Sequence, residues 1–313
     1  MDESRKFKYL FGPVPSRRFG RSLGVDLVPF KKCSFDCVFC QLGKTDKTTM
    51  ERKAYAPIED VLGELGEWLE RDGRADFITL SGSGEPTLHK DFGKVFDFVR
   101  DNSDISTLLL TNSSTLMNAE VRAGAAKADV VKASLSAWDQ ESLVRMNRPS
   151  SELGFDEIVE GLKLFREEYG GELRLEVFLV AGVNDCAEDV SRIASLADSI
   201  RPDLVQLNTA VRPPAEKIGA VSRAKMEELA RLFNQPSEVI ANFKSAGGGA
   251  SQTGREEILA MLKRRPCTVS HIAEVFGMHR NEAVKHIALL MESGVIERKE
   301  EKGETYYFCS SLR

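Results

Sequence analysis

The chain has 313 residues, of which 42% are hydrophobic and 29% are charged, and its formal net charge is −5. These values fit a soluble globular protein with one large and one small domain, and they argue against a disordered chain. No strong basic field points to nucleic acid, and no apolar run is long enough for a transmembrane helix. The segment Met1–Lys6 lacks the apolar stretch of a signal peptide, so we expect a cytoplasmic protein with no membrane partner.

The first predicted elements surround a cysteine-rich loop. Residues 7–22 are rich in Gly, Pro and Arg and predict an extended loop. Leu23–Val28 alternates apolar residues with Gly and Asp and predicts the first strand. After the cysteines, Pro57 opens a predicted helix whose apolar face comprises Ile58, Val61, Leu62, Leu65, Trp68 and Leu69.

Strands and helices then alternate along the chain. The further predicted strands are Phe77–Leu80, Thr107–Leu110, Val130–Leu135, Leu173–Val180 and Leu204–Leu207. The predicted helices are 91–100, 116–126, 141–146, 157–166, 189–200 and 223–233. This order predicts βαβ units and a parallel sheet. We therefore expect an α/β fold with a partial (β/α)6 barrel, whose site lies at the carboxyl ends of the strands.

Three of the six cysteines, Cys33, Cys37 and Cys40, lie within eight residues with the spacing C-x3-C-x2-C. Thiolates are the usual ligands of iron–sulfur clusters, and four ligands close one cluster. The next His is His89 and the next Cys is Cys186, so the loop supplies three ligands and leaves one iron open to an exchangeable ligand. A closed zinc site would also need a fourth ligand nearby, and three unrelated buried thiols are the plain alternative.

The loop resembles the signature of the radical S-adenosylmethionine (radical SAM) superfamily, in which an aromatic residue, here Phe39, precedes the third cysteine. The flanking segments Gly12–Asp26 and Gln41–Thr45 resemble radical SAM proteins grouped with wyosine-synthesis enzymes. The likeness covers roughly the first two-thirds of the chain, a domain-sized unit. Archaeal-type wyosine synthases carry an additional amino-terminal cysteine set, whereas this chain has no cysteine before Cys33.

The resemblance implies a [4Fe–4S] cluster on the three cysteines and SAM as the second cofactor. The segment Ser81–Pro86 resembles the family's Gly-Gly-Glu segment, with Ser83 at its middle position. The resemblance implies that its carboxylate, Glu85, bonds the SAM amino group. The full set of implied SAM ligands is Phe39, Gly82, Gly84, Glu85, Pro86, Thr111, Asn112, Ser134 and Asn184.

Within that set, Thr111 and Ser134 are implied to contact the methionine part of SAM, and Asn112 to line the pocket. Asn184 follows the fifth strand, where it is expected to cover the adenine and ribose. Where the family often has Asp, this chain has Ser136. Small polar residues after strands also cap helices and make turns, so that alternative stays open at these positions.

Several further residues are candidates for a role at the site, but an ordinary structural role fits the sequence equally well. Arg17, Arg18 and Arg21 either hold an anionic substrate or the SAM carboxylate, or form a solvated basic turn. Asn208 and Arg212 follow the sixth strand and are candidates for substrate contact, with turn or ion-pair roles as the alternative. The segment Asn147–Pro149 has the same two readings, and Cys186 is either a thiol hydrogen donor or a small polar residue.

The last quarter of the chain predicts a second domain. Ser245–Ser251 has the composition of a flexible linker, so we divide the chain into a barrel at 1–241, a linker at 242–253 and a small domain at 254–313. A capping box at Thr253 and Glu256, three helices and a β-hairpin predict a winged helix-turn-helix. From residue 254 onward there are 10 Lys and Arg against 9 Asp and Glu, a weak footprint for nucleic acid. The basic candidates on its third helix are His279, Arg280, Lys285 and His286.

The leading hypothesis is a radical SAM enzyme that cleaves SAM reductively to a 5′-deoxyadenosyl radical, which abstracts a hydrogen atom from a substrate. Such an enzyme needs an electron donor such as flavodoxin or ferredoxin. The substrate is not readable from the sequence; a tRNA base, a peptide bound through the winged helix and a small metabolite all stay open. The alternative is a DNA-binding regulator that uses the cluster as a redox sensor and needs no SAM pocket.

Overall fold

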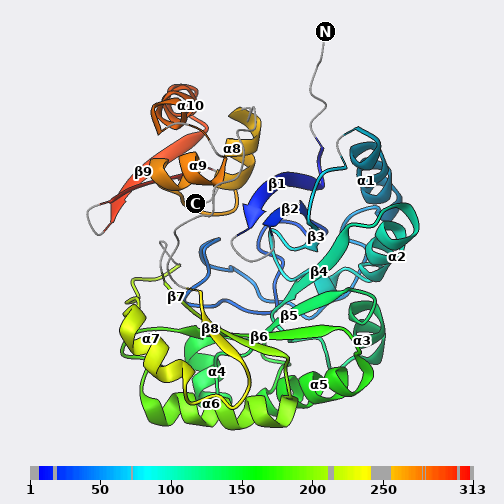
Figure 1. Ribbon diagram of the computed structural model, residues 1–313, viewed down its shortest axis with the longest axis vertical. Helices are drawn as coiled ribbons and strands as arrows, with labels where there is room; N and C mark the ends of the chain where they lie inside the picture. Colours follow the sequence, from blue (N-terminus) through cyan, green and yellow to red (C-terminus); the bar gives the residue numbers. More distant parts are fainter. Residues whose placement is uncertain are drawn as a thin grey trace.

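The computed structural model describes residues 7–16, 20–71, 73–210, 215–240, 255–276, 278, 280–301 and 304–310. Among these residues, none of the helices combines the length and the apolar character needed to cross a membrane. The described chain forms one large curved sheet surrounded by helices, together with a small carboxyl-terminal unit (Figure 1).

The large sheet contains eight strands that follow one another in chain order. Strands β2 to β8 are mutually parallel, and β1 pairs antiparallel with β2. Their bounds are β1 Leu10–Ser16, β2 Gly20–Val25, β3 Phe77–Leu80, β4 Ser106–Thr111, β5 Val130–Ser134, β6 Glu172–Leu179, β7 Leu204–Thr209 and β8 Ser237–Val239. All six predicted strands are present, and the partial parallel barrel is confirmed.

Helices cover the outer face of this sheet (Figure 1). They are α1 Ile58–Arg71, η1 Pro86–Leu88, α2 Gly93–Asn102, α3 Ala119–Ala125, α4 Gln140–Asn147, α5 Phe155–Glu168, α6 Ala187–Ile200 and α7 Arg223–Ala230. Helix α1 buries Ile58, Val61, Leu65 and Trp68, as its periodicity predicts. Trp68 is therefore a core residue, and the main hydrophobic core lies between the helices and the sheet.

The expectation of a loop over residues 7–22 is wrong, because this segment forms β1 and the start of β2. Gly and Pro suggested a loop, but β1 lies at the edge of the sheet, where a proline without an N–H group is tolerated. The strand also requires a small partner: a Cβ atom on Gly24 of β2 would lie 2.0 Å from the Phe11 ring. The edge position of β1 and the glycine opposite Phe11 together explain why a segment rich in Gly and Pro forms a strand.

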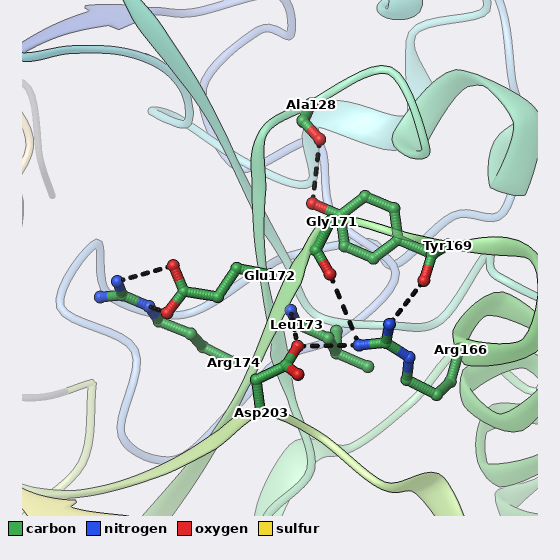
Figure 2. Close-up of polar contacts among 8 residues, drawn as sticks. All are labelled: Ala128, Arg166, Tyr169, Gly171, Glu172, Leu173, Arg174 and Asp203. Carbon is green, nitrogen blue, oxygen red and sulfur yellow. Dashed lines mark hydrogen bonds and ion pairs between the residues drawn. The ribbon is translucent and has the colours of Figure 1, made fainter.

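A polar cluster closes the amino-terminal edge of the sheet, where the strands begin (Figure 2). Asp203 Oδ2 accepts hydrogen bonds from the Leu173 backbone N–H at 2.7 Å and from Arg166 Nη1 at 2.8 Å. The Arg166 guanidinium also donates to the Tyr169 carbonyl at 2.6 Å, and the Tyr169 hydroxyl donates to the Ala128 carbonyl at 2.9 Å. These bonds fix the turn from α5 into β6 and involve only protein groups.

The carboxyl-terminal unit comprises α8 Arg255–Leu262, α9 Val269–Val275, α10 Arg280–Glu292, β9 Ile296–Glu301 and β10 Glu304–Cys309. Its buried hydrophobic residues form a cluster separate from the main core. The Thr268 side chain caps α9, and Gly294 has φ +69° after the end of α10, the left-handed conformation that glycine favours where helices end. The three helices and the hairpin follow the element order expected for a winged helix.

This unit is placed against the barrel: α8 lies beside the edge strand β1 (Figure 1). The predicted linker 242–253, with Thr253 of the expected capping box, lies outside the described residues. So does His279, and the side chains of Arg280 and Lys285 are likewise not described. The domain boundaries themselves stay a prediction.

Candidate functional site

The loop after β2 carries the three predicted cluster ligands, Cys33, Cys37 and Cys40. Each sulfur receives a hydrogen bond from a different part of the chain. Asn112 Nδ2 lies 3.4 Å from Cys33 Sγ, and Asn147 Nδ2 lies 3.2 Å from Cys37 Sγ. Lys31 Nζ lies 3.3 Å from Cys40 Sγ. Because N–H donors favour a charged acceptor, this environment suits thiolates better than thiols.

The donor set fits an iron–sulfur cluster. Burial raises the pKa of Cys33 to about 12, with the negative charges of Glu85 and Cys40 as further causes. Burial, followed by the neighbouring charges of Cys33 and Cys40, also raises the pKa of Cys37. Cys33 and Cys37, whose pKa values are raised, need a positive group nearby before they lose their protons. The cluster irons supply that charge, and the three N–H donors match the sulfurs that bind them.

A single metal ion fits less well. In the described part of the chain, no three His, Cys, Asp or Glu side chains gather as the ligands of one ion would. A structural zinc site requires four ligands around one point. A cubane instead binds each thiolate through a different iron, so its cysteines are spread around the cluster.

Helix α4 ends on the cysteine loop and holds it in place. The Asp36 N–H donates to the Asn147 carbonyl at 3.0 Å, and the Val38 N–H donates to the Met146 carbonyl at 3.0 Å. Helix carbonyls at a carboxyl end have no partner within the helix, and here the loop supplies the N–H groups. Arg148 follows in the left-handed conformation, with φ +44°. The segment Asn147–Pro149 thus positions the cysteines, a role that its sequence alone did not distinguish from a turn.

The Ser81–Glu85 segment lies against the start of the cysteine loop. The Glu85 N–H donates to the Lys32 carbonyl at 2.9 Å, and the Lys31 N–H donates to the Ser83 carbonyl at 2.6 Å. A Cβ atom on Gly84 would lie 1.9 Å from the Lys32 carbonyl oxygen, so only glycine permits this approach. The two predicted motifs are therefore hydrogen-bonded to each other.

Glu85 is buried and accepts four hydrogen bonds. Its Oε1 accepts from the Thr87 N–H at 3.2 Å and from the hydroxyls of Thr87 at 2.6 Å and Thr111 at 2.8 Å. Its Oε2 accepts from the Asn112 N–H at 2.7 Å. Burial raises the pKa of this carboxyl, and the hydrogen bonds oppose the rise. Glu85 thereby joins the ends of β3 and β4, while Oε2 keeps a second acceptor site.

The other implied SAM ligands surround this network. Asn112 also bonds Ser34 through Nδ2 at 2.9 Å, and the Ser134 carbonyl accepts from the Ser113 hydroxyl at 2.9 Å. Pro86 opens η1 directly after Glu85. The Phe39 ring stacks on Phe178 of β6, with ring centroids 4.2 Å apart. The aromatic residue of the cysteine loop therefore packs against a side chain of β6.

Asn184 has a different set of contacts. Its Oδ1 accepts from the Val180 N–H at 2.7 Å, and its Nδ2 donates to the carbonyls of Phe178 at 2.9 Å and Ser136 at 3.1 Å. The side chain is fully buried. Its polar atoms are therefore used to fix the turn after β6. The Ser136 hydroxyl likewise accepts from the Phe178 N–H at 2.9 Å, a structural role for the position where Asp is often found.

A largely buried ion pair includes Glu176, which lies on β6 two residues before Phe178. Lys132 of β5 pairs with Glu176 of β6, and both side chains are largely buried. Asn208 of β7 donates to Glu176 Oε1 at 2.6 Å. The three residues come from adjacent strands, so they form one polar patch across the sheet. Of these three residues, the sequence suggests only Asn208 as a candidate; the alternation of Lys and Glu with apolar neighbours is the signal available for the other two.

Several candidates are placed elsewhere. The Arg21 N–H bonds Asp76 Oδ2 at 2.6 Å, just before β3 begins, so Arg21 lies at the amino-terminal edge and its proposed role at the site is wrong. Cys186 is exposed and caps α6 by accepting from the Asp189 N–H at 3.4 Å. The remaining candidates Arg17, Arg18 and Arg212 lie outside the described residues.

Comparison with known proteins gives a consistent result. The sequence pattern of the Radical SAM superfamily matches residues 27–197. A UPF0026 protein of Methanocaldococcus jannaschii is 31% identical over 307 residues, which cover 95% of this chain and 94% of the relative. A radical SAM methyltransferase from Sphaerobacter thermophilus has a similar fold, with a TM-score of 0.54 at 16% identity, over 70% of this chain and 66% of the other.

A longer relative carries another name. A protein of Brachyspira hyodysenteriae named GTPase Obg is 36% identical over 307 residues, 96% of this chain, but the chain spans only 45% of its length. The present sequence contains no Gly-x4-Gly-Lys-Ser/Thr segment of the kind that binds nucleotide phosphates. The name of that relative is therefore not carried over to this chain, which matches less than half of its length.

Proposed function

The chain belongs to the radical SAM superfamily and to its UPF0026 relatives, and on this basis we propose that Cys33, Cys37 and Cys40 hold a [4Fe–4S] cluster beside a SAM site. The observation that carries the proposal is the N–H donor on each of the three sulfurs. When bound, the cluster and SAM together supply reductive cleavage of SAM and hydrogen abstraction from a substrate. The protein supplies position, hydrogen bonds and exclusion of water.

The proposed SAM site is the space bounded by the two bonded loops. Gly82 and Gly84 let the backbone approach the ligand, Pro86 fixes the turn, and Phe39 provides an aromatic surface. Glu85 holds Asn112 and offers the remaining acceptor site on Oε2 to the SAM amino group. Thr111 and Ser134 complete the set, and we leave Asn184 out because its polar atoms are engaged by the backbone.

The substrate contacts the polar patch formed by Lys132, Glu176 and Asn208. A buried ion pair with an amide partner is costly unless each group is paired, and it offers both a donor and an acceptor to a polar substrate. This favours a substrate with its own hydrogen-bonding groups, such as a nucleobase or a peptide. A flavodoxin or ferredoxin supplies the electron, and the carboxyl-terminal unit is the proposed winged helix that holds the larger substrate.

The test is anaerobic reconstitution followed by reaction with SAM and a strong reductant. We expect bound iron, a broad visible absorption band and release of 5′-deoxyadenosine. Cys33→Ala, Cys37→Ala and Cys40→Ala should each lose the cluster and this product. Cys186→Ser is the matched control, because Cys186 only caps α6 and a hydroxyl can replace it. Retention of iron by all three alanine variants would contradict the assignment.

A further inference from the structure

The carboxyl-terminal unit places one largely buried arginine against the barrel. Arg264 lies just after α8, and its guanidinium carbon lies 3.5 Å from the centre of the Phe11 ring of β1. Its Nη2 lies 3.6 Å from Asp26 Oδ2, and Nη1 donates to the Ala260 carbonyl at 2.9 Å. Its Nε is buried without a hydrogen-bond partner. An arginine held in this way costs desolvation energy, so its contact with Asp26 needs a compensating gain.

Asp26 joins this arginine to the proposed SAM site. It follows β2 directly, and its Oδ1 and Oδ2 accept from the Ser83 N–H at 3.1 Å and the Ser83 hydroxyl at 2.5 Å. A Cβ atom on Gly82 would lie 2.4 Å from the Asp26 carboxyl carbon, so the glycine loop is seated directly on this carboxylate. Both the polar and the steric contacts of Asp26 therefore fix the same loop.

The connection continues into the cysteine loop. The Ser83 carbonyl accepts from the Lys31 N–H at 2.6 Å, and the Lys31 ammonium lies 3.3 Å from Cys40 Sγ. A series of direct contacts thus runs from Arg264 through Asp26 and Ser83 to Lys31. It joins the carboxyl-terminal unit to the two loops that we assign to SAM and to the cluster.

We propose that Arg264 is a positioning residue for SAM binding: the carboxyl-terminal unit, when docked on β1, holds the Ser81–Glu85 loop in its binding conformation through Asp26. The proposal rests on the function proposed above. Arg264 itself contacts Asp26 and Phe11 rather than the SAM site, so it acts through Asp26. Occupation of the carboxyl-terminal unit by a substrate or partner can then change SAM affinity, and SAM must change the docking of that unit by the same factor.

The physical reason is the charge state of Asp26. Burial raises the pKa of Asp26, and the Ser83 hydrogen bonds, followed by the Arg264 charge, oppose the rise. Without the guanidinium, the carboxyl group more readily takes up a proton. A neutral carboxyl accepts weaker hydrogen bonds than a carboxylate, so the Ser83 segment loosens. Replacing Arg264 should therefore weaken SAM binding without removing any SAM contact.

The experiment measures the equilibrium dissociation constant of SAM on the full-length, cluster-loaded protein. Arg264→Gln should weaken binding about fivefold or more, the lower end of typical coupling between sites. Arg264→Lys, which keeps a positive charge near Asp26, should recover most of the loss. Arg265→Gln is the matched control, because Arg265 contacts Met261 of its own unit and should bind SAM like the wild type. The loss of SAM affinity in the double variant Asp26→Asn with Arg264→Gln should be smaller than the sum of the two single losses, because both substitutions break the same contact.

Hydrogen exchange provides the second readout. SAM should slow exchange in α8 of the wild type but not of Arg264→Gln, while the unfolding midpoints show whether the variant is merely unstable. If the wild type binds SAM and Arg264→Gln binds it equally well, the positioning role is overturned. If the wild type binds no SAM, the proposed function fails instead, and faster exchange at Ser83 in Arg264→Gln still tests the link through Asp26. Unchanged exchange there would then overturn the inference independently.

Discussion

The two edges of the parallel sheet both carry dense polar networks, and the two networks end on different groups. At the amino-terminal edge, Arg166, Tyr169 and Asp203 bond one another and the backbone, and every bond shown joins protein groups (Figure 2). At the carboxyl-terminal edge, the bonds through Asn112 and Asn147 end on cysteine sulfur. The first network is complete as it stands, whereas the second has donors directed at atoms that become better acceptors when they bind iron. We therefore interpret the first edge as structural and propose the second as the functional one.

The largest effect is expected from breaking the carboxylate at the functional edge. Glu85→Ala removes four hydrogen bonds and leaves the part-buried Asn112 N–H without its acceptor. We expect the apo-protein to lose about 3 kcal/mol or more of unfolding free energy, because each unsatisfied buried group costs about 1–3 kcal/mol. Urea denaturation measures this loss, and iron loading and SAM binding should fall with it.

Glu85→Gln is the informative companion variant. Its amide oxygen can still accept from Thr87 and Thr111, but its NH2 group faces the Asn112 N–H, so we expect an intermediate loss. An unfolding free energy of Glu85→Ala within about 1 kcal/mol of the wild type would show that this network contributes little to the fold.

A smaller effect, of a different kind, is expected at the structural edge. Asp203→Ala should cost about 1–2 kcal/mol, since two hydrogen bonds are lost and the carboxylate is half exposed. Iron loading and SAM affinity should stay at wild-type values. The control is Glu172→Gln in the neighbouring, similarly exposed pair with Arg174, where the amide oxygen can still accept a hydrogen bond and we expect less than about 1 kcal/mol. Loss of SAM binding in Asp203→Ala would break the distinction between the two edges.

The smallest expected effect concerns the cluster rather than the fold. Asn147→Leu keeps the size of the side chain but removes the donor to Cys37. Hydrogen bonds to cluster sulfurs stabilise the more negative, reduced state. One bond of about 1 kcal/mol corresponds to roughly 40 mV for a one-electron couple, so the midpoint potential should fall by about that amount. A potentiometric titration followed by electron paramagnetic resonance measures it, with Asn234→Leu on the surface as the control. An unchanged potential would show that the contact does not tune the cluster.

Local patterns were sufficient for most of the sheet. The segments 130–135 and 173–180 predicted β5 and β6, because apolar residues recur at every second position, which is the period of a strand. Strand β8 was missed because Ser237–Val239 is only three residues long, with two polar residues among them. Strand β1 was misread because Pro13 and Gly12 are typical of loops, and only its edge position makes them compatible with a strand.

The site could be predicted only in part, because some of its residues are close together in the sequence and others are far apart. The cysteine spacing and the position of Glu85 after β3 are visible in a short stretch of sequence. The partners of the sulfurs are not, because Asn147 lies 110 residues from Cys37 and Asn112 lies 79 residues from Cys33. Such contacts depend on how α4 and β4 are placed in the folded barrel. The same holds for Arg264, whose role depends on the docking of a separate unit against β1.

The position of α8 on β1 also affects how the protein behaves in a crowded solution. An uncovered edge strand presents unpaired N–H and C=O groups that can template β-sheet growth between molecules. Here Pro13 and Pro15 remove two N–H donors from β1, and α8 lies along the same strand. A barrel made without its carboxyl-terminal unit would keep the prolines and lose the helix. Its solubility would then depend on two imino acids, so self-association is a defect to expect from that truncation in addition to the weaker SAM binding proposed above.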